Sequence, residues 1–400
     1  MYKSLLWMRL PALCLGLILV FGVQANEPQA FVIGLDADMS SVAAEGGIAI
    51  YRGASLAIDE INNNGGVLGR NLSLVVKDHR GNPARGLHNL SQLQETPNLL
   101  AVVGGVHTPV VLKELAFIHQ NKMVFLVPWA AGTAIIDNGF EPNYVFRVSV
   151  RDSEAASVIL NDVHQRGIQR VALILERTGW GRSNESSMGL VASQLGLEIV
   201  ATEWINWRQQ EFDDAISRVA ASGAQALVMV ANAPEGAVVA ESLYNNTQTR
   251  VLPIVSHWGI AGGKFVELLG LEKLVKLDLS VLQTFHFDQA NNPQLAADLF
   301  ARYSKTFDSE VQPKNIKGQV GFAHAYDLIH MLASAVNNAQ SAESEAVRKA
   351  LCRLKVHEGL IKQYEHPFTE SQDALWASDY ILTSYDAQGD LVPRTRTISE

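Results

Sequence analysis

The sequence has few cysteines and lacks the short motifs that mark common catalytic sites. Its 400 residues include only Cys14 and Cys352. It contains no glycine-rich loop ending in Gly-Lys-Ser/Thr, no dinucleotide-binding fingerprint, no Gly-x-Ser-x-Gly and no His-Glu-x-x-His. These absences argue against the corresponding nucleotide-dependent, serine-hydrolase and zinc-protease chemistries. We therefore expect no catalytic residues, no cofactor and no metal site, and the sequence favours binding over chemistry.

The chain also lacks blocks of basic residues. It has 32 Lys and Arg against 41 Asp and Glu, and its formal net charge is −9. A surface that binds nucleic-acid phosphates needs an excess of positive charge. The composition therefore predicts no nucleic-acid partner.

One apolar run stands out, at the N-terminus. Lys3 and Arg9 precede Leu10–Val23, and Val23-Gln24-Ala25 fits the small–x–small cleavage pattern of a secretory signal peptide. The run has about 14 residues, fewer than the roughly 20 that a membrane-spanning helix needs. We predict a cleaved signal peptide over residues 1–25. Cleavage would leave a net charge of −11 and Cys352 alone, so no internal disulfide can form. Export without disulfides fits a bacterial periplasm, and we predict a periplasmic location.

Short apolar runs alternate with helical patterns through both halves of the remaining chain. The first series extends from Phe31–Ala37 to Tyr144–Val150, and the second from Arg170–Glu176 to Val251–Ser256. This alternation predicts an α/β fold with parallel sheets flanked by helices, in two doubly wound lobes. Crossings between lobes are expected near residues 146–151, 283–288 and 355–367. Lobe 1 is then residues 26–149 plus 286–355, and lobe 2 is residues 150–285 plus 356–400, including a C-terminal hairpin.

The stretch Leu99–Thr133 carries the clearest local signal. It is predicted as a strand, a glycine turn at Gly104-Gly105, a helix starting near Thr108, a second strand and an open loop. A right-handed β-α-β crossover makes its strands parallel, so loops 104–109 and 128–133 emerge at one edge of the sheet, where α/β proteins bind ligands. Free backbone N–H groups at the helix start suit a carboxylate. The alternative is a plain core turn that needs glycine for close packing.

Several segments in order resemble a known family. After the leader come GLDADMSSVAAEGGIAIYRGASLAIDEINNNGGVLGR, VVGGVHTPVV, VPWAAGT, YVFRVSVRDS, RVALILERTGWGRS and IVSHWG. Together they resemble the type I periplasmic solute-binding proteins of ABC importers, in the leucine/isoleucine/valine-binding class, over residues 31–395. The resemblance implies two Rossmann-like lobes, a three-segment hinge and a cleft that closes on a ligand.

The resemblance also implies where a ligand would bind. Matching positions in the two lobes are His107, Thr108, Trp129, Ala130, Ala131, Thr133, Trp180 and Asn232. Two positions depart from the family pattern: the acid for the ligand amine falls on Trp258, and an aromatic position falls on Glu45. Rings near a carboxylate suit a cation or a flat aromatic ring, so we hypothesise a ligand other than leucine, isoleucine or valine. The alternatives are hinge packing for the tryptophans and a solvated loop acid for Glu45.

The implied function is an exported receptor that captures an amino acid or related small polar solute. It would deliver that small-molecule ligand to a membrane ABC permease, and we expect a monomer. Two alternatives remain open. One is a ligand sensor for a periplasmic signalling partner with the same fold. The other is a metal-dependent hydrolase that uses His107, His257 or Asp288.

Overall fold

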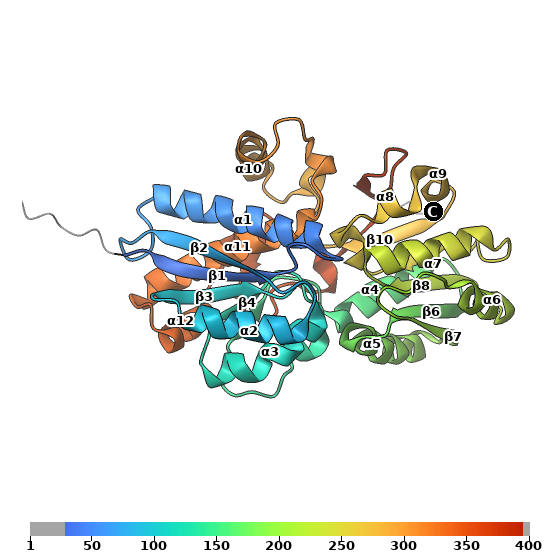
Figure 1. Cartoon of the computed structure of the whole chain (residues 1–400), viewed down its shortest axis with the longest axis horizontal. Helices are drawn as coiled ribbons and strands as arrows, with labels where there is room; N and C mark the ends of the chain where they lie inside the picture. Colours follow the sequence, from blue (N-terminus) through green and yellow to red (C-terminus); the bar gives the residue numbers. More distant parts are fainter. Residues whose placement is uncertain (1–28, 395–400) are drawn as a thin grey trace, which may run out of the picture.

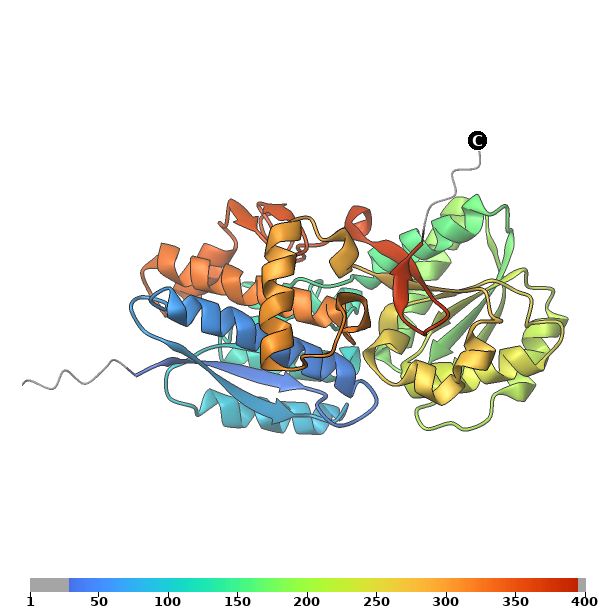
Figure 2. The same ribbon diagram turned by 90° about the horizontal axis from the view of Figure 1, so that it is seen from above.

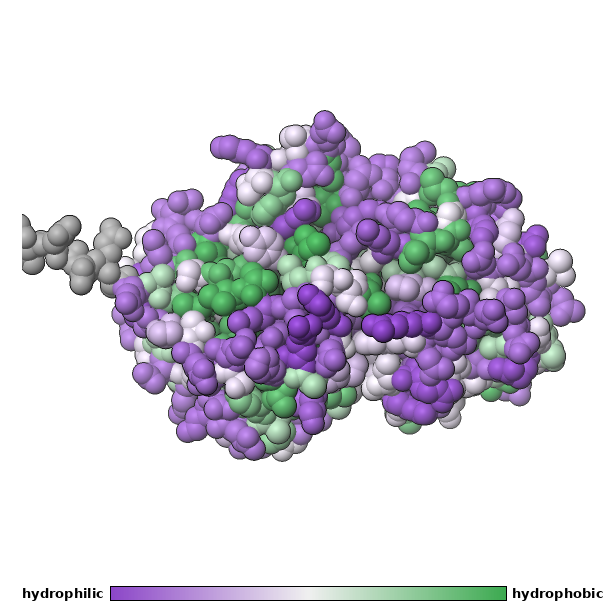
Figure 3. Space-filling view, viewed as in Figure 1, coloured by the Kyte–Doolittle hydropathy of each residue, from purple (hydrophilic) through white to green (hydrophobic). Residues whose placement is uncertain are grey.

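The computed structural model describes residues 29–394 and shows two α/β lobes side by side (Figures 1 and 2). The predicted signal peptide, residues 1–25, lies outside the described residues, as do residues 395–400. Hydrophilic side chains cover most of the face in Figure 3, with hydrophobic patches on both lobes. Between residues 29 and 394, none of the helices combines the length and hydrophobicity needed to cross a bilayer.

The first lobe is built on a five-stranded parallel sheet. Its strand order is β2 (Leu72–Asp78), β1 (Phe31–Ala37), β3 (Leu99–Gly104), β4 (Phe125–Val127) and β5 (Val145–Arg147). The helices of this lobe are α1 (Ala44–Asn63), α2 (Pro83–Gln94), α3 (Thr108–Gln120), α10 (Pro293–Thr306), α11 (Gln319–Ala339) and α12 (Ser344–Leu351), and α10 lies outside α1 (Figure 1). β3 reads LLAVVG, a continuous apolar run, because both faces of the sheet are covered.

Close packing in this lobe depends on a glycine where two helices meet. α1 and α11 lie side by side, and a Cβ placed on Gly53 of α1 would lie 2.1 Å from the carbonyl oxygen of Phe322 in α11. On the opposite face of the sheet, α2 and α3 contribute Leu90 and Val111 to a separate apolar cluster. The sheet is therefore sandwiched between two helical layers.

The second lobe has a seven-stranded mixed sheet. Its order is β14 (Leu391–Pro393), β13 (Ile381–Tyr385), β10 (Leu279–Gln283), β9 (Ile254–Ser256), β8 (Ala226–Val230), β6 (Arg170–Glu176) and β7 (Glu198–Ile205). The C-terminal hairpin is confirmed: β13 pairs antiparallel with both β10 and β14, and the other pairs are parallel. The helices are α4 (Asp152–Gln165), α5 (Gly179–Leu195), α6 (Asp213–Ala221), α7 (Ala233–Asn245), α8 (Phe265–Leu269) and α9 (Leu271–Leu274).

The β-α-β unit predicted over Leu99–Thr133 is confirmed. β3 and β4 are parallel neighbours, with Val102 opposite Phe125, and α3 begins at Thr108. β4 is shorter than the predicted run, since it begins at Phe125 and not at Met123. The loops after both strands emerge at the same edge of the sheet, facing the second lobe.

The contacts of a small hairpin indicate where the boundary between the lobes lies. β11 (Val356–Glu358) pairs antiparallel with β12 (Gln363–Glu365). Asp327 of α11 accepts hydrogen bonds from Leu360 N at 2.7 Å and Tyr364 Oη at 2.8 Å. The sequence boundary at 355 assigns this hairpin to lobe 2, but its contacts are with α11 of lobe 1. We therefore propose that lobe 1 extends to about residue 373, where the chain bonds to β5, and that the third crossing follows it.

Candidate functional site

The carboxyl ends of strands from both lobes face one small cavity, which we call the cleft cavity. Its volume is about 10 Å³, room for about one water molecule. A solute the size of an amino acid therefore needs the lobes to part before it enters. The lining residues from lobe 1 are Val106, His107, Thr108, Pro109, Trp129 and Ala131, and those from lobe 2 are Glu176, Thr178, Trp180, Trp207, Asn232, Trp258 and Gly259.

Thr108 ties together the two loops of the predicted ligand-binding edge. Its Oγ1 accepts a hydrogen bond from Gly132 N at 3.1 Å, and a Cβ on Gly132 would lie 2.4 Å from the Thr108 methyl carbon. This bond uses the hydroxyl as an acceptor and leaves its hydrogen free to donate. Thr108 is thus buried, oriented and still able to bond a ligand acceptor.

Two predicted residues support this edge without lining the cavity. The Ala130 carbonyl accepts a hydrogen bond from Arg147 Nη1 at 3.3 Å. Thr133 bonds to the second lobe: its N–H donates to Ser183 Oγ at 3.2 Å, and its Oγ1 accepts from Ser153 N at 3.2 Å. The structure therefore gives Ala130 and Thr133 positions in the loop framework, outside the cavity lining.

The ring of Trp129 occupies a slot between three glycines. Cβ atoms placed on Gly46, Gly262 and Gly321 would lie 3.2, 3.0 and 2.8 Å from its ring carbons. Gly46 and Gly321 belong to lobe 1 and Gly262 to lobe 2, so this ring contacts both lobes. Its centroid is 5.2 Å from that of Trp258, with the two planes tilted by 33°. Trp129 and Trp258 therefore pack against each other between the lobes, and this packing is part of the role of these tryptophans, in line with the alternative given from the sequence.

Trp180 is held by a buried acid at the start of α4. Its Nε1 donates to Asp152 Oδ1 at 3.1 Å, and its ring lies edge-on to His257, 5.1 Å between centroids. His257 accepts a hydrogen bond from Trp258 N at 2.9 Å, and its other ring nitrogen lies 3.3 Å from the same Asp152 oxygen. The orientations of Trp180 and Trp258 are thus set by one shared polar cluster.

Sequence reasoning missed six of the residues that line the cavity, and two of them, Glu176 and Trp207, carry polar side-chain groups that bond to each other. Glu176 ends β6 and is only 1% exposed. Its Oε1 accepts from Asn232 N at 2.6 Å and Asn232 Nδ2 at 2.7 Å, and its Oε2 accepts from Trp207 Nε1 at 2.6 Å. Burial raises the pKa of Glu176 to about 7, against the opposing effect of these hydrogen bonds. An acid directly after the apolar run VALIL, and buried with it, is the signal that could have found it.

Trp207 extends from the connection between β7 and α6 of lobe 2 to residues of lobe 1. A Cβ on Gly81 would lie 3.2 Å from its ring, and its centroid is 5.4 Å from that of His107. His107 Nε2 lies 2.9 Å from Asp38 Oδ2. Burial acts to raise the pKa of Asp38, but hydrogen bonds from His107 and two backbone N–H groups outweigh it and lower that pKa.

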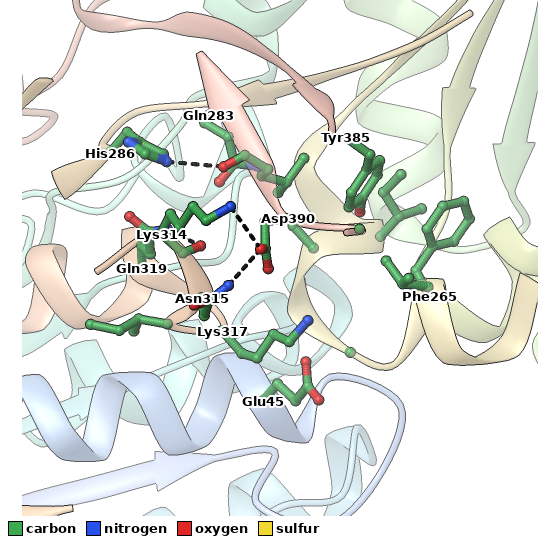
Figure 4. A pocket seen from close by; sticks show the side chains of 18 of the residues that line it. Glu45, Phe265, Gln283, His286, Lys314, Asn315, Lys317, Gln319, Tyr385 and Asp390 are labelled. Carbon is green, nitrogen blue, oxygen red and sulfur yellow. Dashed lines mark hydrogen bonds and ion pairs between the residues drawn. The ribbon is translucent and has the colours of Figure 1, made fainter. Parts of the chain in front are cut away.

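Glu45 does not join the tryptophans and lines a second cavity of about 50 Å³ between the lobes (Figure 4). There its carboxylate points toward the ammonium group of Lys317, and burial raises its pKa. Across the same cavity, Lys314 of lobe 1 lies 3.4 Å from Asp390 Oδ2 of the C-terminal hairpin (Figure 4). Lys314 also bonds to Asp386 of that hairpin at 3.0 Å. The structure does not bring Glu45 together with Trp180 and Trp258, because the side chain at the start of α1 points to this other cavity.

The residues named for a metal-dependent hydrolase belong to separate clusters. His107 pairs with Asp38, His257 with Asp152, and Asp288 lies 3.7 Å from His286. Across residues 29–394, no group of three or more His, Cys, Asp or Glu side chains is arranged to hold a metal ion.

Comparison with known proteins agrees with this two-lobed architecture. Residues 31–389 match the family model described as periplasmic binding protein. An amino acid binding protein of Pseudomonas aeruginosa is 23% identical over 94% of this chain and 96% of its own. The Leu/Ile/Val-binding protein BraC3 of Rhizobium johnstonii is 24% identical over 80% of this chain and 82% of its own.

Solved structures share the fold. A type 1 periplasmic binding protein from Bordetella pertussis superposes with a TM-score of 0.81 at 19% identity, covering 91% of this chain and 99% of its own. The substrate-binding protein LivJ of Streptococcus pneumoniae, in complex with isoleucine, has a TM-score of 0.76 at 21% identity, covering 91% of this chain and 100% of its own. With two α/β lobes, a cavity between them and a family match over most of its length, this chain belongs to the periplasmic binding protein family, a family of solute-binding proteins and not of enzymes.

Proposed function

We propose that the protein is an exported receptor that captures an amino acid or related small polar solute and passes it to an ABC permease. The observation that carries this proposal is the cleft cavity, to which both lobes contribute polar groups and tryptophans at the carboxyl ends of their strands. The names of the amino acid binding and Leu/Ile/Val-binding relatives support it. We also propose that residues 1–25 direct export to the periplasm and that the receptor is a monomer.

Binding is coupled to movement of the lobes about the connecting segments. In this structure the lobes are held together by contacts such as Thr133 N to Ser183 Oγ and Lys314 to Asp386. Because the cavity of this structure is too small for an amino acid, a ligand that bonds to both walls would favour an arrangement in which the lobes close around it. The closed arrangement would be the form that a permease recognises.

A ligand screen tests the proposal directly. Thermal unfolding of the mature protein is measured with amino acids, amides, polyamines, quaternary ammonium compounds and aromatic acids, because a ligand that binds the folded state raises Tm. We expect at least one compound to raise Tm and to bind with one-to-one stoichiometry in calorimetry. An absence of binding by the whole panel contradicts the receptor proposal. A bound ligand that fails to stimulate ATP hydrolysis by the reconstituted permease contradicts the transport role.

Replacing Thr108 by valine is expected to weaken binding of the screened ligand by about 1–2 kcal/mol, roughly 5- to 30-fold in Kd. The methyl group that replaces the hydroxyl keeps the shape but removes both the ligand partner and the acceptor for Gly132 N. Calorimetry measures the change. Thr247→Val is the matched control, because Thr247 is exposed in the second lobe. Equal affinities for the two variants would remove Thr108 from the site.

A further inference from the structure

Four of the thirteen residues that line the cleft cavity are tryptophans. Four indoles surround it, from Trp129 of lobe 1 and from Trp180, Trp207 and Trp258 of lobe 2. Three of these side chains are less than a tenth exposed, and the polar edges of Trp180 and Trp207 are held by Asp152 and Glu176. Indole faces carry negative electrostatic potential and attract cations, most strongly where water is excluded.

The charged groups at this cavity are also biased toward one sign. None of the lining residues is Lys or Arg, Glu176 is the lining acid, and the lining His107 is paired with Asp38. Behind Glu176, the carboxyl of Glu235 is 1% exposed, and its Oε2 has no hydrogen-bond partner within residues 29–394. Two basic side chains act on Glu235, those of His107 and Arg208, and the backbone N–H of Arg208 also donates to Glu235 Oε1 at 2.8 Å. Burial raises the pKa of both acids, that of Glu176 to about 7, so a bound cation would stabilise their ionised forms. This wall therefore favours a ligand with positive charge and disfavours one that is only an anion.

The hydrogen bonds of Glu176 indicate what kind of cation fits. A carboxylate offers about four lone-pair sites, and three are already used by Trp207 Nε1, Asn232 N and Asn232 Nδ2. A primary ammonium group brings three N–H donors that each need an acceptor. An alkylated nitrogen has few or none, so it can be held by charge and by ring faces alone.

Building on the proposed function, we propose that the ligand carries its positive charge on an alkylated nitrogen, such as a trimethylammonium group. That group sits among the four tryptophans, and Glu176 is the residue that selects for its charge. This assignment transfers to Glu176 the role that the sequence alone suggested for Glu45.

Charge recognition is tested with pairs of compounds of equal shape. Glycine betaine is compared with 3,3-dimethylbutanoate, and choline with 3,3-dimethylbutan-1-ol, because each pair differs by a charged nitrogen replaced by a neutral carbon. Calorimetry on the wild-type protein is expected to give at least one compound with a quaternary nitrogen that binds about tenfold or more tightly than the partner in which a neutral carbon replaces that nitrogen, which we call its neutral partner. Tetramethylammonium and carnitine extend the panel.

Two variants assign the effect to residues. Glu176→Gln keeps the size of the side chain and is expected to weaken cation binding about tenfold or more, while binding of the neutral partner changes by less than about twofold. Trp207→Leu removes one aromatic ring at a half-buried position and is expected to weaken cation binding several-fold. This variant still tests the proposal if Glu176→Gln folds poorly. Glu198→Gln is the control, since Glu198 is exposed at the start of β7.

Each failure has a distinct meaning. If leucine, another primary ammonium compound or an anion binds and the alkylated cations do not, the charge proposal is overturned and the receptor function stands. Equal affinities for charged and neutral partners, or a full charge preference retained in Glu176→Gln, overturn it as well. If nothing in either panel binds, the receptor function fails with it.

Discussion

Replacing Asp373 by alanine is expected to remove about 3–5 kcal/mol from the free energy of unfolding. Asp373 and Arg147 are both fully buried and form an ion pair, and Asp373 Oδ2 also accepts from Arg151 Nη1 at 3.0 Å. Without the carboxylate, the guanidinium of Arg147 stays buried with no charge partner. Leaving one member of a buried pair alone costs far more than the pair itself contributes.

The same change is expected to disturb the ligand-binding edge. Arg147 Nη1 donates to the carbonyl oxygens of Ala130 and Gly132, at 3.3 and 2.9 Å, in the loop that follows Trp129. The backbone around Asp373 also bonds to β5, since Arg147 N donates to the Gln372 carbonyl at 2.8 Å. One buried pair thus connects the chain entering the third crossing with the loop that carries part of the cleft cavity.

Denaturant unfolding measures this loss, and a double variant tests its cause. Arg147→Met with Asp373→Leu removes both charges and is expected to recover part of the stability, because no uncompensated charge remains buried. Glu203→Ala is the control, since it breaks an ion pair with Arg218 at the protein surface, where solvent screens the charges and a much smaller loss is expected. A loss for Asp373→Ala no larger than the control's would contradict this account.

A second large effect is expected from Glu114→Gln, and it depends on pH. Glu114 of α3 and Asp36 of β1 are buried side by side, and burial raises the pKa of both, that of Asp36 to about 7. Asn89 Nδ2 donates to Asp36 Oδ1 at 2.7 Å. Within residues 29–394, Asp36 Oδ2 and both oxygens of Glu114 have no other donor. A proton held between the two carboxyls is therefore the remaining donor for this pair.

The sign of the pH dependence follows from that raised pKa. Between about pH 4 and pH 7 the unfolded chain has released its proton while the folded protein retains it, so the contribution of this pair to stability falls as pH rises. The amide side chain of the Glu114→Gln variant carries a permanent N–H donor and no charge. At pH 8 the variant is expected to be more stable than the wild type by about 2–3 kcal/mol, with a smaller difference at pH 5.

Urea unfolding of both proteins at pH 5 and pH 8 checks this prediction. The decisive quantity is the change in the stability difference between the two pH values, because other titrating groups contribute equally to both proteins. Glu95→Gln, at an exposed position in the same lobe, is the control. A difference that does not change with pH would mean that the two carboxyls do not share a proton.

The parts of the fold that follow from short-range patterns could be predicted from the sequence. The apolar run of β3, the glycine turn after it and the start of α3 at Thr108 are local features, and the parallel pairing of β3 with β4 follows from crossover handedness. The small hairpin of β11 and β12 could not be read in the same way. Its strands, VHE and QYE, are short and largely polar, and its position depends on the distant Asp327.

For the candidate site, too, the sequence predicted the local features and the tertiary structure decided the rest. The periodicity of apolar residues is a local property, so it was enough to predict the α/β architecture in two lobes, and family resemblance identified Thr108, Trp129, Trp180 and Trp258 as residues to examine. Which side chains share a cavity depends on contacts between distant segments. Glu45 and Glu176 are both acids next to apolar segments, and the sequence does not show which of them lies at the cleft cavity. Packing between the lobes decides the direction of each side chain. It places Glu45 beside Lys317, and it places Glu176 where its carboxylate accepts a hydrogen bond from Trp207.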